Sequence, residues 1–159
     1  MSGERRENVI ASEAKDNRQP RRFDMPLITW SDELAVRTKE IDDQHKRLID
    51  LLNRLFDAMK QGKGRDALSP VLDERAQYTV YHFGTEEGLF REYGYPDAET
   101  HKAEHDAFAR RVIDFQQAFE AGNKPITVDV LQFLTDWLQH HITQIDKKFG
   151  LFLKDKGVS

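Results

Sequence analysis

Two pairs of residues four positions apart, His82–Glu86 and His101–His105, are the part of this sequence best suited to chemistry. On a helix, residues four apart lie one above the other on the same face, so each pair offers two ligating side chains to one point. A third segment carries His141 with Asp146 five residues later, and a fourth carries His45 alone. Five imidazoles and two carboxylates on four segments indicate a metal site.

Each fragment by itself has an ordinary explanation. A single histidine on an apolar stripe, such as His45, is more often a hydrogen-bonded core residue than a ligand, and His82–Glu86 also fits a surface pair. The combination is different, because burying unpaired carboxylates costs several kcal/mol each, a large share of a typical net stability of about 5–15 kcal/mol. Bound cations remove this cost, since borderline divalent metals prefer carboxylate and neutral imidazole.

Spacing also selects the ligands among neighbouring residues. Glu86 shares the face of His82, whereas Glu87 is turned by about 100° more. His141 lies on the apolar stripe of its segment and His140 on the flank, so His141 is the better ligand. The five-residue step to Asp146 does not suit a straight α-helix, and it predicts a π-type distortion or a long-reaching geometry.

The number of candidate ligands favours two metal ions over one. Seven side chains exceed a single octahedron, and two carboxylates that bridge serve both ions. With one bridging oxygen, three histidines complete the six ligands of one metal ion. The remaining two histidines leave the other ion with one open coordination position. Such a position is what a small diatomic ligand needs.

Four amphipathic helices are predicted to hold these residues, because apolar residues recur at three- and four-residue intervals around each of them. The predicted helices run from Asp42 to about Lys60, from Asp66 or Ser69 to about Tyr93, through His101 and His105 to a stop before Gly122, and onward from Pro125 and Thr127. Short connections imply antiparallel neighbours. The fold class is therefore all-α, an up-down-up-down antiparallel four-helix bundle with a left-handed twist.

Three local signals refine these helices. Asp42 is an acceptable N-cap for the first helix, and Pro70 suits the first turn of the second. The fourth helix is expected to break or bend before Gly150, with a short docking turn at 151–153 after it.

The region before the bundle divides into two parts. Residues 1–24 are polar, charged and aperiodic, which predicts a disordered extension. This extension is either a leader without a specific role or a basic docking arm. Residues 25–156 form the predicted bundle domain, which begins with an extended arm around Pro26-Leu27-Ile28-Thr29-Trp30.

Composition excludes several classes of function. The first 22 residues carry six basic and four acidic residues, and the remainder carries 18 basic and 24 acidic. An acidic body argues against nucleic acid or an anionic membrane as the main partner. The chain contains no cysteine, which excludes disulfides, thiolate zinc sites and iron–sulfur clusters. The absence of an apolar leader or membrane-length stretch favours a cytoplasmic location.

Several motifs, in order over about residues 27–153, resemble those of the bacterial hemerythrins. They are Ile28-Thr29-Trp30, Asp42-Asp43-Gln44-His45, His82-Phe83-Gly84-Thr85-Glu86-Glu87, Gly94-Tyr95-Pro96, His101-Lys102-Ala103-Glu104-His105 and Trp137-Leu138-Gln139-His140-His141-Ile142-Thr143-Gln144-Ile145-Asp146. Two positions depart from the usual pattern, Phe90 in place of a common methionine and Arg37 in place of a small residue. Neither is a candidate ligand.

The resemblance implies a non-haem di-iron centre, two iron ions per chain with a bridging oxo or hydroxo group, that binds O2 reversibly. It implies that His101, His105 and His141 bind the six-coordinate iron, and that His45 and His82 bind the iron with the open position. Glu86 and Asp146 would then bridge the two ions. The family's O2 pocket falls on Leu48, Phe83, Trp137, Leu138 and Ile142, an apolar lining that excludes water.

Three functions follow from this resemblance. The first is an oxygen carrier, store or delivery protein, which is not an enzyme and acts as a monomer with O2 as its ligand. An oxygen-using enzyme or a reductase is then the candidate protein partner. The second is a di-iron oxidase or peroxidase, and the third is a sensor module for O2, iron or redox state. The excess of histidine over carboxylate favours O2 binding over O2 activation.

Overall fold

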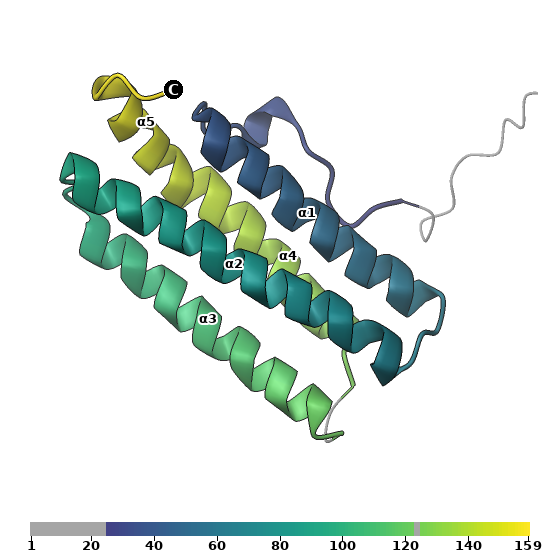
Figure 1. Ribbon diagram of the computed structural model, residues 1–159. Helices are drawn as coiled ribbons and strands as arrows, with labels where there is room; N and C mark the ends of the chain where they lie inside the picture. The colour runs from purple at the N-terminus through teal and green to yellow at the C-terminus, as the bar shows by residue number, and fades with distance from the viewer. Residues whose placement is uncertain (1–24, 123–124) are drawn as a thin grey trace, which may run out of the picture.

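The computed structural model describes residues 25–122 and 125–159. Four long helical segments lie side by side and alternate in direction (Figure 1). They are α1 (Lys39–Lys60), α2 (Arg65–Tyr93), α3 (Ala98–Glu120) and a fourth segment formed by α4 (Val128–His140), η2 (His141–Asp146) and α5 (Lys147–Asp155). The described residues contain no strand, and the predicted four-helix bundle is confirmed. The predicted extension at 1–24 lies outside the described residues.

The arm before α1 first runs along that helix and then forms one short 3-10 helix, η1 (Asp32–Leu34). Asn53 of α1 donates to the carbonyl oxygen of Ile28 at 2.8 Å and accepts from the Ile28 backbone nitrogen at 3.3 Å. Ile28, Leu34 and Val36 are buried against the bundle. The arm is therefore part of the core.

The prediction that Asp42 caps the first helix is wrong. The helix begins at Lys39, after Thr38. The Asp42 carboxylate instead accepts hydrogen bonds from the backbone nitrogens of Val36 at 2.8 Å and Arg37 at 3.1 Å. Arg37 has a φ of 65°, in the left-handed region, so the arm turns sharply and leaves two donors that a carboxylate can satisfy.

Two other predicted boundaries also differ from the structure. The second helix begins at Arg65 after Gly64, so Pro70 lies inside α2 and not in its first turn. The predicted break before Gly150 is wrong, because α5 runs through that residue. A Cβ at position 150 would collide with the carbonyl oxygen of Val36. Glycine is thus needed there for the close approach of the arm, and it does not end the helix.

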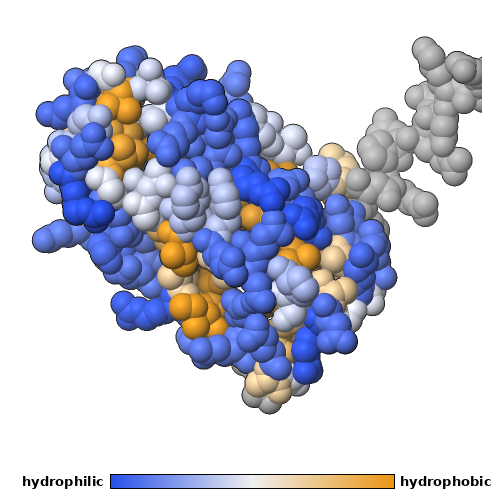
Figure 2. Space-filling view, viewed as in Figure 1, coloured by the Kyte–Doolittle hydropathy of each residue, from blue (hydrophilic) through white to orange (hydrophobic). Residues whose placement is uncertain are grey.

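The remaining core is apolar and drawn from every helix. Its fully buried members include Ile41, Leu52, Leu55, Leu131 and Phe149. Hydrophilic residues dominate the face seen in Figure 2, with apolar residues scattered among them. None of the described helices combines the length and apolarity needed to cross a membrane.

Candidate metal centre

All four helical segments contribute to one cluster of polar side chains inside the bundle. Each of these side chains belongs to a residue that is at most 2% exposed. They are His45 from α1, His82 and Glu86 from α2, His101 and His105 from α3, and His141 and Asp146 from η2. The structure therefore brings together all seven residues that the sequence analysis proposed as ligands. His140, which the same analysis rejected, is exposed.

Three imidazoles meet through their Nε2 atoms. The Nε2 atom of His141 lies 3.2 Å from that of His101 and 3.1 Å from that of His105. A separation of about 3 Å is expected between adjacent ligand atoms that each lie about 2.1 Å from one octahedral metal. Three ring nitrogens that point at one another in a buried space are therefore arranged as ligands of one ion.

Each of the two carboxylates faces both sides of the cluster. Glu86 Oε2 lies 3.0 Å from His105 Nε2, while Glu86 Oε1 lies 3.4 Å from His82 Nε2. Asp146 Oδ1 lies 2.9 Å from His101 Nε2, and Asp146 Oδ2 lies 2.8 Å from His45 Nε2. One oxygen of each carboxylate is thus available to each of two neighbouring positions, as bridging ligands require.

The donor atoms form two overlapping groups, and within each group all lie within 4.8 Å of one another. The larger group is Glu86, His101, His105, His141 and Asp146, and the smaller is His45, His82, Glu86 and Asp146. Two ions fit, with five protein residues around one and four around the other. The ion with four retains more coordination positions for other ligands.

Several buried polar atoms of this cluster lack hydrogen-bond partners within the protein. Both oxygens of Glu86, both oxygens of Asp146 and both ring nitrogens of His45 are in this condition. Buried polar atoms are normally hydrogen-bonded, because leaving them without partners costs free energy. Carboxylate and imidazole donors suit a divalent metal such as iron, so this donor set fits a di-iron centre.

Burial and neighbouring charge shift the pKa values of these imidazoles in different directions. Burial, assisted by the charge of His45, lowers the pKa of His82 to about 3, so its ring is neutral and able to bind a metal. Burial also acts to lower the pKa of His101, but the close carboxylates of Asp146 and Glu86 outweigh it and raise that pKa to about 9. A metal ion must therefore displace a proton from His101.

The helical distortion predicted between His141 and Asp146 is confirmed as the π-helix η2. Its hydrogen bonds join residues five apart, as from the Lys147 backbone nitrogen to the Ile142 carbonyl. This spacing places His141 and Asp146 on one face. Asp146 Oδ1 consequently lies 3.1 Å from His141 Nε2.

Two residues that support the cluster were missed by the sequence analysis. Gln44 Oε1 lies 2.7 Å from Nδ1 of His82, and the Gln44 amide donates to Thr85 Oγ1 at 3.1 Å. Glu87 Oε1 lies 3.2 Å from Nδ1 of His105. Such partners fix the orientation and tautomer of a ligating imidazole. The signal available in the sequence was adjacency, since each residue directly neighbours a candidate ligand.

A small cavity of ≈ 10 Å³ lies beside the cluster, with space for about one water-sized sphere. Its lining includes Leu48, Phe83, Trp137 and Leu138, four of the five predicted pocket residues. The fifth, Ile142, is fully buried nearby on η2 but does not line this cavity. Aromatic rings brace the wall, because Trp137 stacks on His141 at 4.3 Å and on Phe108 at 3.7 Å between ring centroids.

Known proteins share this sequence pattern and this architecture. The family described as "Hemerythrin HHE cation binding domain" matches residues 36–152. Bacteriohemerythrin of Methylococcus capsulatus is 38% identical over 127 residues, which cover 79% of this chain and 96% of that protein. The hemerythrin-like protein of Naegleria gruberi is 32% identical over 120 residues, covering 76% of this chain and 88% of that protein. The crystal structure of wild-type hemerythrin has a TM-score of 0.76 and 38% identity, and the match covers 80% of this chain and 98% of that one.

Proposed function

The chain belongs to the hemerythrin family, and on that premise we propose that it binds O2 reversibly at a non-haem di-iron centre, as an oxygen carrier, store or delivery protein. The observation that carries this proposal is the unequal size of two donor groups that share one pair of carboxylates. Five residues converge on one position and four on the other, and Glu86 and Asp146 belong to both groups. An ion with fewer protein ligands has room for an external ligand.

In this proposal the five histidines are divided between the two ions, and the two carboxylates serve both. His101, His105 and His141 hold the ion with more protein ligands, and His45 and His82 hold the other. When bound, iron with an oxo or hydroxo group would supply the electrons that O2 binding takes up and its release returns. The chain's own contribution is to fix the geometry, because Gln44 and Glu87 orient the imidazoles from outside.

The cavity beside the cluster supports binding of a small apolar gas. Leu48, Phe83 and Leu138 are each at most 6% exposed and bring no polar atoms to its wall. These apolar side chains admit O2 and help to keep water away from the metal ions, which slows irreversible oxidation. This lining therefore favours reversible binding over turnover.

The alternative, a di-iron oxidase or peroxidase, has less support from the donor set. Ferritin-like di-iron proteins use mainly carboxylates, with Glu-x-x-His pairs. This sequence contains no such pair, and its cluster holds five histidines and two carboxylates. A histidine-rich set of this kind favours binding.

The deciding experiment is spectroscopic. The full chain is purified, analysed for metal, reduced without air and then exposed to O2 and purged. We expect two irons per chain and a visible charge-transfer band that appears with O2 and disappears on purging. A band that appears but does not reverse would favour the oxidase or peroxidase, and a protein without iron would contradict the proposal.

A leucine substitution tests the cavity itself. Leu138→Ala should keep two irons per chain but oxidise irreversibly several-fold faster, because water gains access to the metal ions. The rate is measured as decay of the O2-dependent band in air. Leu151→Ala is the matched control, since Leu151 is 66% exposed on α5. Equal rates in wild type and Leu138→Ala would remove this residue from the pocket.

A further inference from the structure

Arg75 is a buried cation that neither the fold nor the proposed metal centre explains. It lies on α2, is 3% exposed, and follows the same stripe as Thr79, His82 and Glu86. It makes no hydrogen bond through its guanidinium and no ion pair with any residue that the structure describes, and its Nε atom is buried without a partner. Its guanidinium makes a cation–π contact with Phe108, whose ring centroid lies 5.8 Å from the Arg75 Cζ atom.

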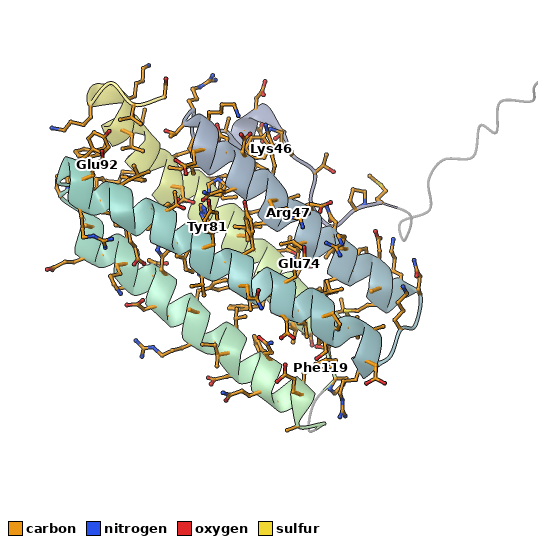
Figure 3. The ribbon with its side chains drawn as sticks, in the orientation of Figure 1. Lys46, Arg47, Glu74, Tyr81, Glu92 and Phe119 are labelled. Carbon is orange, nitrogen blue, oxygen red and sulfur yellow. The ribbon has the colours of Figure 1, made fainter. Side chains whose placement is uncertain are left out.

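The acidic residues next to Arg75 are engaged elsewhere. Glu74 faces outward and pairs with Arg47 and Arg54 of α1, the latter at 3.2 Å (Figure 3). Asp73 is exposed and accepts from the Gln116 side chain. Neither of these two carboxylates is therefore left to neutralise the guanidinium.

This charge cannot be lost by deprotonation at neutral pH. Burial lowers the pKa of Arg75 to about 10, and no nearby charge contributes to that shift. The guanidinium is thus still protonated at pH 7, in an environment where an uncompensated charge is costly. A cation–π contact offsets only a small part of this cost.

Arg75 lies on the wall of two small cavities in the bundle. One is the ≈ 10 Å³ cavity beside the metal cluster, and the other is a cavity of ≈ 20 Å³ toward the opposite end of the bundle. The second is lined mainly by apolar side chains, among them Leu72, Val112 and Leu134. Each cavity has space for about one particle of the size of a water molecule or slightly larger.

From this arrangement we propose that Arg75 binds a small monovalent inorganic anion, of the halide type, in the ≈ 20 Å³ cavity that it lines together with Leu72, Val112 and Leu134. A guanidinium offers several donors in one plane and prefers anions as partners. Water can accept from these donors but carries no charge, so it leaves the cation uncompensated. The walls supply little other polar surface, so the anion is held chiefly by Arg75.

Metal binding at the centre increases the need for an anion beside Arg75. Asp146 lines the metal-side cavity together with Arg75, and both Asp146 and Glu86 belong to the ligand groups. Two multivalent cations more than neutralise two carboxylates, so Arg75 then faces a positive centre. An anion near the guanidinium reduces this repulsion. The inference goes beyond O2 binding, because it assigns a second ligand at a second place.

Crystallography with bromide tests the site directly. Crystals of the metal-loaded full chain are grown or soaked in sodium bromide, and anomalous diffraction is collected at the bromine edge. We expect a bromide peak in contact with the Arg75 guanidinium, and no such peak in Arg75→Met. Cavities that hold only water, or no anomalous peak at Arg75, would overturn the proposal whether or not the protein binds O2.

Thermal unfolding provides a second measurement in solution. Sodium chloride replaces sodium gluconate at constant ionic strength, and the midpoint of unfolding is recorded. The wild type should gain about 2–4 °C in a saturable manner, as a ligand of the folded state requires. Arg75→Met should begin from an equal or higher midpoint and show no chloride effect.

Two control variants separate this site from general salt effects. Arg110→Met removes the same charge from an exposed position on α3, and it should respond to chloride as the wild type does. Arg75→Lys retains the charge and should keep part of the response. A chloride response in Arg75→Met equal to that of the wild type would refute the assignment.

Discussion

The two halves of the bundle interior are built on opposite principles. Toward the end of the bundle that holds the α1–α2 connection, the core consists of apolar residues such as Leu55, Leu68, Phe119 and Leu131, all at most 7% exposed. Phe119 marks this end of α3 in Figure 3. The other half holds the seven buried histidines and carboxylates, many of whose atoms lack partners within the protein.

Burial of side chains therefore has opposite effects on stability in the two halves of this domain. In the apolar half, removal of side chains from water is itself the stabilising event. In the polar half, burial costs free energy unless cations compensate the carboxylates. We therefore expect the apolar half to govern folding and the polar half to become stable mainly on metal binding.

The largest effect should come from a ligand substitution in the polar half. His101→Ala removes one of the three Nε2 atoms that meet in the larger donor group. We expect loss of iron together with much of the metal-linked stability, because binding and folding energies are coupled. Metal analysis and thermal unfolding measure both effects.

His140→Ala is the matched control for this substitution, since His140 is exposed beside the buried His141. It should retain both irons and a nearly unchanged unfolding midpoint. Two irons per chain in His101→Ala would show that the ligand assignment is wrong.

A substitution in the apolar half should lower stability without affecting the metal. Leu55 is fully buried, and Leu55→Ala should reduce the free energy of unfolding by about 2–5 kcal/mol. Chemical denaturation measures this loss. Metal content in native buffer should stay at the wild-type value, and loss of iron in this variant would mean that the two halves are not separable.

A smaller effect is expected where the protein only orients a ligand. Gln44→Leu removes the hydrogen bond at Nδ1 of His82 but leaves the ligating Nε2 atom. Loss of such a partner typically weakens metal binding by about 10- to 100-fold. Chelator competition gives the affinity. Gln77→Leu, at an exposed position of α2, serves as control and should bind metal as the wild type does.

The most gradual effect should be a pH dependence of metal affinity, measured per pH unit. The pKa of His101 is raised from 6.5 to about 9, so its proton stabilises the metal-free fold below about pH 6.5, and this contribution is lost as pH rises through about 9. Because a metal ion must displace that proton, affinity should rise about tenfold per pH unit within this window. Zn²⁺ competition between pH 6.5 and 9 measures the slope, and a flat profile would contradict the assigned proton.

Much of the fold was predictable because its signals are local. The four helices follow from apolar residues at three- and four-residue intervals, and their existence needed no tertiary information. Their starting points were not predicted correctly, since the first two helices begin directly after Thr38 and Gly64. Asp42 was misassigned because its partners, the backbone nitrogens of Val36 and Arg37, come from a turn of the arm.

The sequence by itself determined which candidate ligands share a helix face, because the pairs His82–Glu86 and His101–His105 remain together in any packing of their helices. The five-residue step from His141 to Asp146 likewise predicted the π-helix. Only the tertiary structure decided which oxygen of Glu86 faces which histidines, and that Gln44 and Glu87 support the rings. It alone revealed that Arg75 is buried and that its Nε atom has no hydrogen-bond partner. The physical reason is that contacts between helices depend on their mutual rotation and approach, which sequence spacing along any single helix does not contain.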